Sequence, residues 1–190
     1  MGVGNTAVNP LFLAAQEVQH LCEGEGWDFC FIGGLAVQRW GEPRHTRDVD
    51  LTLLTGFGAE GAYVARLLER LPGRVDDPGG FALRARVVLL RNSDGVPLDV
   101  ALGALPFETR SVHRSSVWRV PGVDPLRTCG AEDLVVHKVF AGRDRDWADV
   151  RGIVDRQGAR LDWELIESEP RLLLELKETP EAWDRRHALR

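Results

Sequence analysis

The order of helical and β-prone segments is the feature that most constrains the fold of this chain. Apolar residues recur at helical spacing after Pro10, and a β-prone run follows at 28–32. Two further β-prone runs flank the short Asn92–Gly95 turn, which is typical of a hairpin. The expected strands are 28–32, 49–55, 81–91 and 96–102, with a short one at 117–120 in an otherwise irregular stretch over 103–128. The expected helices are 11–24, 35–40, 58–72, 131–141 and 145–156, with one or two more after residue 162.

This order predicts an α/β (α+β) fold in which a mixed sheet is flanked by helices and the C-terminal half is helical. The chain has 190 residues, enough to bury a core without disulfides or a structural metal. We expect a core over 1–103 and a mainly helical region over 104–190 packed on it.

Charge and composition exclude several classes of protein. The net charge of -5 argues against a dedicated DNA-binding module, although one local basic wall remains compatible with it. The apolar runs are too short to cross a membrane, and the first ten residues lack the features of a secretion signal. Cys22, Cys30 and Cys129 have no ligand-like spacing, and we expect buried free thiols. A cytoplasmic protein without a membrane partner is predicted.

Three carboxylates are candidates for a metal site. Asp48 and Asp50 begin an expected strand, where residues two apart face the same side. Asp99 lies on the second strand of the hairpin, which could pair beside the strand of Asp50. Carboxylates suit a hard cation such as Mg²⁺. Taken alone, however, Asp-X-Asp is more often a solvated strand end.

A glycine pair at 33–34 adds to this pattern, because it stands between an expected strand and a helix. Glycine allows close approach of backbone to a ligand, and helix N-terminal amides suit phosphate. An isolated Gly-Gly is otherwise an ordinary tight turn. With three carboxylates, two Mg²⁺ ions could support in-line phosphoryl transfer. Asp50 and Asp99 would then bridge to the acceptor hydroxyl, and Asp48 would help hold the metal of the nucleotide.

Three segments together resemble the DNA polymerase β-type nucleotidyltransferase superfamily: Phe31-Ile-Gly-Gly-Leu-Ala, Thr46-Arg-Asp-Val-Asp-Leu-Thr and Leu98-Asp-Val. The signature of that superfamily is Gly-Gly or Gly-Ser, then Asp-X-Asp/Glu, then a third carboxylate. The resemblance implies an NTP substrate and Mg²⁺, with two ions and with Mn²⁺ as a substitute. It also implies that the metal-binding and catalytic residues are Asp48, Asp50 and Asp99, and that Gly33 and Gly34 contact the nucleotide.

The segment from Lys138 to Asp149 is similar to the lysine and arginine–aspartate motifs of the AbiEii-like nucleotidyltransferase toxins and their uncharacterised relatives. The resemblance, which covers 28–155, implies that Lys138 and Arg143 bind the nucleotide and that Asp146 orients one of them. It leaves Asp149 either in the site or as a helix-stabilising partner. From the residues themselves, Gly142 suits a helix C-cap and Asp144 the next N-cap. The alternative is a surface helix pair with many ion pairs.

The sequence says less about the acceptor molecule than about the nucleotide that is transferred. The toxin resemblance implies transfer to RNA, notably the 3′ end of tRNA, and a possible antitoxin partner. The segment 109–130 is locally basic and carries Trp118, which could stack on a base, although these arginines could equally pair with acids. Its arginines are Arg110, Arg114, Arg119 and Arg127. Alternative acceptors are an aminoglycoside-type antibiotic or a protein, and the contrasting class is a non-catalytic nucleotide-binding module.

Overall fold

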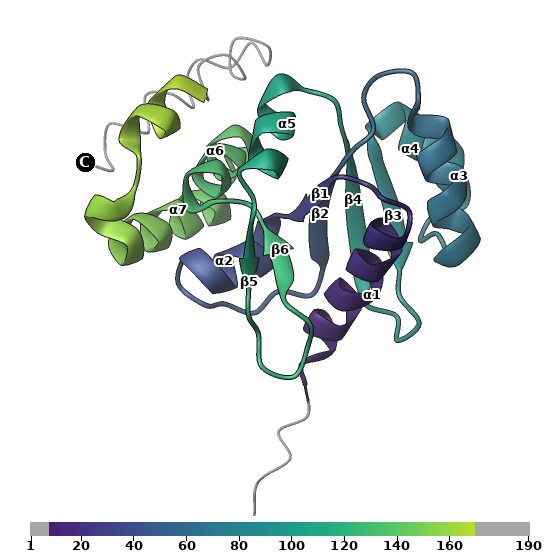
Figure 1. The fold of residues 1–190 in the computed structure, drawn as a ribbon, viewed down its shortest axis with the longest axis horizontal. Helices are drawn as coiled ribbons and strands as arrows, with labels where there is room; N and C mark the ends of the chain where they lie inside the picture. The colour runs from purple at the N-terminus through teal and green to yellow at the C-terminus, as the bar shows by residue number, and fades with distance from the viewer. Residues whose placement is uncertain (1–7, 170–190) are drawn as a thin grey trace, which may run out of the picture.

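A computed structural model describes residues 8–169 and places one six-stranded mixed sheet at their centre (Figure 1). The strand order is β3-β4-β2-β1-β6-β5. The β2/β4 and β1/β6 pairs are parallel, and the other neighbours are antiparallel. The strands are β1 (Phe29–Phe31), β2 (Val49–Leu54), β3 (Val87–Arg91), β4 (Pro97–Gly103), β5 (Ser116–Trp118) and β6 (Leu126–Thr128). The predicted α/β class is confirmed.

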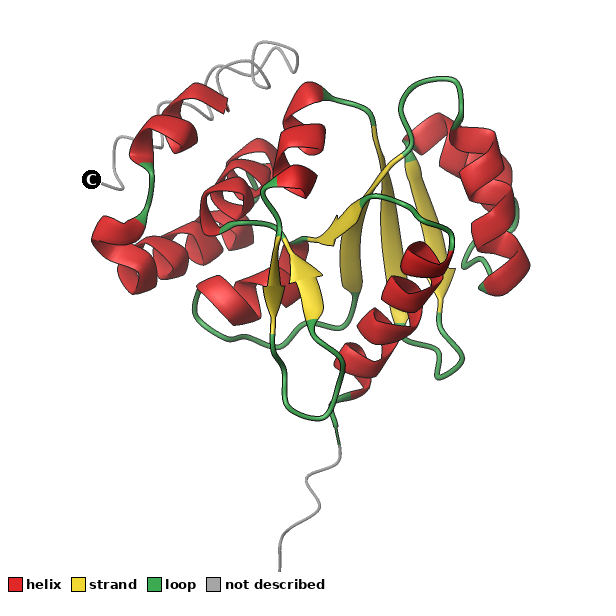
Figure 2. Ribbon diagram, in the orientation of Figure 1, coloured by secondary structure: helices red, strands yellow, loops and turns green. Residues whose placement is uncertain are grey.

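Helices cover both faces of the sheet (Figure 2). The first layer packs on the alternate apolar residues of β2 and β4, and it contains α1 (Pro10–Gly24), α3 (Glu60–Arg70) and α4 (Pro78–Ala85). The second layer forms a separate apolar cluster with α2 (Gly33–Trp40), α5 (Pro106–His113), α6 (Ala131–Ala141) and α7 (Asp144–Gln157). Because Val49, Leu51 and Leu53 face the first layer, Asp50 faces the second.

The expected strand over 81–91 is wrong in its first half, because residues up to Ala85 belong to α4. Asp77 accepts a hydrogen bond from the Gly80 N–H (2.9 Å), and Pro78 occupies the first helical turn. These two features start a helix that overrides the β propensity of the run. Arg86 then adopts a left-handed backbone (φ 53°), and β3 begins at Val87. The predicted hairpin between β3 and β4 is present.

The stretch 103–128 is more regular than expected, since it holds α5, β5 and β6. Both strands join the central sheet, so the second half of the chain contributes to the same sheet as the first. Helical residues resume at 163–169 after a 3₁₀ turn at Gly158–Arg160, and the rest of the helical segment expected after residue 162 lies outside the described residues. The three cysteines are buried and free, as expected. Between residues 8 and 169, no helix is long and apolar enough to cross a membrane.

Candidate active site

The three predicted carboxylates meet at the start of two parallel strands. The register of β2 and β4 places Asp50 opposite Asp99, and Asp48 immediately precedes β2. Each offers an oxygen, and these oxygens all lie within 4.8 Å of one another. All three residues are partly buried. Strand alternation and parallel pairing therefore bring together the residues that the sequence singled out.

The glycine pair at the N-terminus of α2 makes room for this cluster. Gly33 has φ 58°, and a Cβ there would lie 2.0 Å from Oδ2 of Asp50. A Cβ on Gly34 would lie 2.3 Å from the Thr46 hydroxyl oxygen. The Gly34 N–H also donates a hydrogen bond to the Asp50 carboxylate. The glycines thus admit two side chains of the protein itself, whereas the sequence pointed only to close approach of a ligand.

Burial, with the neighbouring like charges as a smaller cause, governs the electrostatics of the cluster. Burial, followed by the charges of Asp48 and Asp99, raises the pKa of Asp50 to about 6. Burial also raises the pKa of Asp99, and its pairing with Arg74 opposes that shift. Three converging carboxylates are the oxygen donor set that Mg²⁺ or Mn²⁺ prefers. The residues present therefore fit the divalent cation that the superfamily resemblance implies.

Arg74 is a site residue that the sequence did not indicate. It lies between α3 and α4, and its backbone N–H donates to the Leu89 carbonyl (2.8 Å), which fixes it beside edge strand β3. From there its guanidinium forms an ion pair with Asp99. The segment carries no local motif, so only the tertiary pairing with β3 reveals this contact.

Lys138 lies between two buried carboxylates of α7. Its Nζ is 3.1 Å from Asp146 and 2.8 Å from Asp149, and the three side chains are 7%, 0% and 4% exposed. Arg143 donates to Asp146 from Nε (2.6 Å) and from its backbone N–H (3.3 Å). Gly142 (φ 71°) ends α6, as predicted. The expected N-cap at Asp144 is wrong, because α7 begins at that residue and the Asp146 side chain satisfies the Arg143 N–H.

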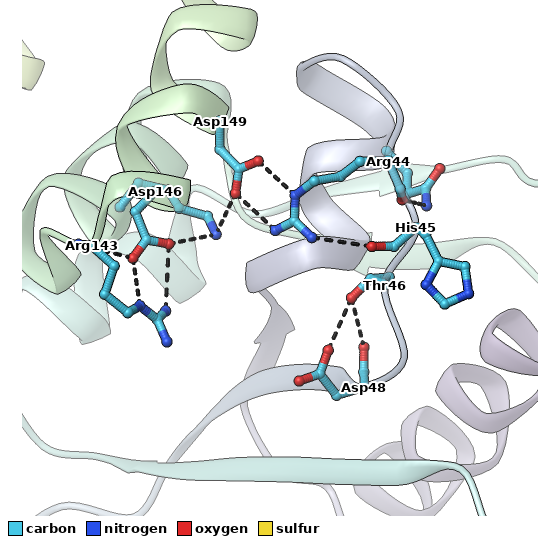
Figure 3. A network of polar contacts seen from close by, with 9 residues as sticks. Arg44, His45, Thr46, Asp48, Arg143, Asp146 and Asp149 are labelled. Carbon is cyan, nitrogen blue, oxygen red and sulfur yellow. Dashed lines mark hydrogen bonds and ion pairs between the residues drawn. The ribbon is translucent and has the colours of Figure 1, made fainter.

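A second unpredicted arginine extends this network to the loop before β2 (Figure 3). Arg44 donates from Nε and Nη2 to the two oxygens of Asp149 (2.6 and 2.8 Å). Close by, Thr46 donates to the Asp48 carboxylate (2.9 Å). Burial alone would raise the pKa of Asp149, but hydrogen bonds from Arg44 and Lys138 outweigh it, so the pKa is lowered. Asp149 therefore stays ionised and ties the loop to α6 and α7.

The carboxylates and the cations line one pocket of about 210 Å³. His137 also reaches it, and burial lowers the pKa of this imidazole to about 4, so it is neutral. The other lining residues named so far are Gly33, Gly34, Arg44, Thr46, Asp48, Asp50, Asp99, Lys138, Arg143 and Asp146, and Arg145 joins them. Carboxylates and cations in one cavity match the needs of a metal-bound polyphosphate.

The basic segment expected to contact RNA is partly neutralised. Arg110 pairs with Glu169 (2.5 Å), and Arg114 pairs with both Asp133 (2.5 Å) and Glu169 (3.2 Å). Trp118 packs edge-on against Phe12, with ring centroids 5.6 Å apart. Two further arginines of the segment, 119 and 127, are exposed. Two of its four arginines thus hold helices together, which is the structural alternative considered for them.

Similar folds occur among solved nucleotidyltransferase structures. An antigenic nucleotidyltransferase-like protein from Paracoccidioides brasiliensis superposes with a TM-score of 0.51 at 15% identity over 90% of both chains. The antibiotic-resistance factor ANT(2″)-Ia in solution gives 0.52 at 14% identity, over 90% of this chain and 95% of that one. ANT(2″)-Ia in complex with adenylyl-2″-tobramycin gives 0.53 at 17% identity, over 83% and 94%. No family model matches the chain, and no curated protein matches it in sequence. The chain shares the fold of these structures.

Proposed function

We propose that this protein is a divalent-metal-dependent nucleotidyltransferase of the EC 2.7.7 type, which moves a nucleoside monophosphate from an NTP to an acceptor hydroxyl. The observation that carries the proposal is the convergence of Asp48, Asp50 and Asp99 within 4.8 Å, in the same pocket as Lys138 and Arg143. The shared fold and the superfamily motifs support it.

The carboxylates and the cations have separate roles in this proposal. Asp48, Asp50 and Asp99 would hold two Mg²⁺ ions, or Mn²⁺ in their place, which supply charge neutralisation at the reacting phosphate. Lys138 and Arg143 would bind the triphosphate, and the backbone at Gly33–Gly34, which lines the pocket, would lie against it. The acceptor oxygen bonds to the α-phosphorus, and the bond from that phosphorus to the β-phosphate oxygen breaks. Pyrophosphate leaves with the electron pair, and the hydroxyl proton passes to solvent.

Asp146 and Asp149 position Lys138 in this scheme. Both carboxylates contact its Nζ, and both belong to α7, so they hold the ammonium group in the wall of the pocket rather than reacting themselves. Arg44 anchors Asp149 from the other side. A cation held in place before the nucleotide arrives reduces the reorganisation required at the transition state.

The first candidate acceptor is RNA, such as a tRNA 3′ end, in a cytoplasmic toxin that could have an antitoxin partner. This candidate follows from the resemblance of Lys138–Asp149 to the AbiEii-like branch. The second candidate is an amino sugar, because one similar fold is that of ANT(2″)-Ia in complex with adenylyl-2″-tobramycin. Each acceptor requires a different surface beside the carboxylates.

Label transfer tests the proposal directly. The purified protein is incubated with each α-³²P-labelled NTP, Mg²⁺ and, separately, total RNA or tobramycin, and the labelled product is followed. We expect label on an acceptor from the wild type and label below detection with Asp50→Ala. A circular dichroism spectrum of Asp50→Ala equal to that of the wild type shows that the variant is folded.

Each outcome has a defined meaning. Label on RNA or on tobramycin that requires Asp50 supports nucleotidyl transfer and identifies the acceptor. Label on the protein would redirect the proposal to protein modification. Equal label from Asp50→Ala contradicts the metal assignment. Absence of label, together with NTP binding by calorimetry, would favour a non-catalytic nucleotide-binding module.

A further inference from the structure

The two sides of the carboxylate cluster differ in the side chains that a ligand would contact. Lys138, Arg143 and Arg44 lie on the side formed by α6, α7 and the loop before β2. On the other side of β2, the sheet continues through β4 to the edge strand β3 (Figure 1). If the triphosphate occupies the first side, the acceptor must approach Asp99 from the second.

The second side is an apolar surface with positive charge. On the face of β3 and β4 that carries Asp99, the neighbouring side chains are partly or fully exposed. They are Val87, Leu89, Arg91, Pro97 and Ala101, together with Asp99 itself. Arg91 is the one other charged side chain among these strand residues. No acid besides Asp99 occurs on this face of the two strands.

Arg74 adds a second cation at the same edge. The register runs from Asp50 across Asp99 to Leu89, and the Leu89 carbonyl accepts the Arg74 N–H. Arg74 pairs with Asp99, yet its Nε is buried and has no hydrogen-bond partner among residues 8–169. A ligand cannot reach this buried nitrogen, but the Arg74 side chain is 27% exposed and its guanidinium has five N–H donors, more than the ion pair with Asp99 uses. A phosphate oxygen at the exposed part of the guanidinium would accept a further charge-assisted hydrogen bond.

We propose that Arg74 and Arg91 form an acceptor-binding site for a phosphate group, so that the acceptor is a phosphorylated, anionic molecule. This inference rests on the proposed nucleotidyl transfer and defines its acceptor class. The apolar surface of Leu89 and Val87 contacts the uncharged part of the acceptor, and the two guanidinium groups bind its phosphate. When divalent cations neutralise Asp48, Asp50 and Asp99, a polycationic amino sugar would meet two unopposed arginines here and be repelled.

Binding measurements without turnover test the site. A fluorescein-labelled, single-stranded RNA with a free 3′ hydroxyl is titrated with the wild type and with Arg91→Gln, and the anisotropy gives Kd. Arg91 is exposed, so its replacement preserves the fold. We expect Kd to rise about tenfold in Arg91→Gln, and similarly in Arg74→Gln, because each loses a charge-assisted contact. The matched control is Arg151→Gln, an exposed arginine on α7, for which we expect Kd within about twofold of wild type.

Competition then identifies the source of the phosphate. Displacement of the RNA by glucose 6-phosphate shows that one phosphorylated sugar is enough, and a failure to displace it shows that the site requires a polynucleotide. Both results support the site if the arginine variants lose binding. Wild-type Kd in Arg74→Gln and Arg91→Gln overturns the inference, as does an equal loss in Arg151→Gln. Binding of tobramycin but of neither phosphate probe overturns it too.

Failure of this inference is distinguishable from failure of the proposed function. Asp50-dependent label transfer tests the chemistry, whereas the anisotropy titration tests acceptor binding without NTP. Label transfer to an acceptor with unchanged acceptor KM in Arg91→Gln would leave the proposed function standing and remove the site. ATP affinity measured by calorimetry should be equal in the wild type and Arg91→Gln, since Arg91 is not a lining residue of the nucleotide pocket.

Discussion

Two neighbouring groups of buried or partly buried carboxylates differ in the charges that surround them. In the paired network of Arg44, Lys138, Arg143, Asp146 and Asp149, every carboxylate contacts at least two cations. In the carboxylate cluster of Asp48, Asp50 and Asp99, three like charges lie within 4.8 Å of one another, and Arg74 pairs with Asp99 alone.

The difference appears in the acidity of the carboxyl groups. The pKa is lowered for Asp146 and Asp149, and it is raised for Asp50 and Asp99. The paired network is thus complete without a ligand and stabilises the fold. The carboxylate cluster costs folding free energy until a cation joins it, which is a property of sites built for binding rather than for stability.

The strongest test of the comparison is to break the paired network. Lys138→Ala leaves Asp146 and Asp149 buried beside each other with fewer cations, and we expect the free energy of unfolding to fall by about 3 kcal/mol. ATP affinity should fall in the same variant, since a phosphate ligand is lost. Urea unfolding and calorimetry measure the two effects.

Arg145→Ala is the matched control for this change. Arg145 lines the same pocket but is exposed, so its replacement should alter stability by less than about 0.5 kcal/mol. Equal stability of Lys138→Ala and Arg145→Ala would show that the network carries no folding free energy. ATP binding equal to wild type in Lys138→Ala would remove Lys138 from the nucleotide site.

The second test uses pH to separate the two regions in metal-free protein with EDTA. The pKa of Asp50 is about 6 in the folded state against an ordinary value of 3.8, so the native state binds more protons between these values. The stability of the wild type relative to Asp50→Asn should therefore fall as pH rises from about 4 to about 6, by about 2 to 3 kcal/mol in total.

Asp149 should give the opposite sign. Its pKa is lowered on folding, so the wild type gains stability over Asp149→Asn above the ordinary value of 3.8 and loses that advantage as the pH falls. Thermal unfolding across the pH range measures both differences. Two profiles of the same sign would end the distinction between the carboxylate cluster and the paired network.

The carboxylate cluster could be predicted from sequence because it depends on regular geometry. Alternation puts Asp48 and Asp50 on one face, and the pairing of β2 with β4 brings Asp99 opposite Asp50. Helix spacing likewise places Asp146 and Asp149 on one face of α7, where both reach Lys138. Strands and helices repeat at fixed intervals, so the relative positions of these side chains can be predicted from a single sequence.

The remaining features depend on contacts that are distant in sequence. Arg74 and Arg44 belong to connecting segments, whose course is set by the edge of the sheet and by α7. The expected strand over 81–91 is wrong at its start because the capping of α4 by Asp77 and Pro78 outweighs the β propensity of the residues after it. The start of this helix and the course of these segments depend on competition between local sequence preferences and on tertiary packing.

Gly33→Ala tests how tightly the carboxylate cluster is fitted to α2. The new Cβ would stand 2.0 Å from Oδ2 of Asp50 at a left-handed backbone position, so both the backbone and the carboxylate must shift. We expect a loss of about 2 kcal/mol in stability, together with reduced label transfer. Gly24→Ala is the control, since a Cβ there meets nothing within 4 Å. Full label transfer by Gly33→Ala would show that the position of Asp50 is not critical.

The smallest expected effect comes from adding Mg²⁺ to the carboxylate cluster, a change that breaks no contact. Mg²⁺ should stabilise the wild type by about 1.4 kcal/mol when its concentration is about ten times the dissociation constant, because the cation binds only the folded cluster. Asp50→Asn lacks one of the three ligands, so its melting temperature should barely respond to Mg²⁺. The paired network contains its own cations, and Arg44→Gln should therefore retain the full Mg²⁺ response. Thermal unfolding with Mg²⁺ or EDTA gives all three values, and a Mg²⁺ response shared by Asp50→Asn and the wild type would place the cation elsewhere on the protein.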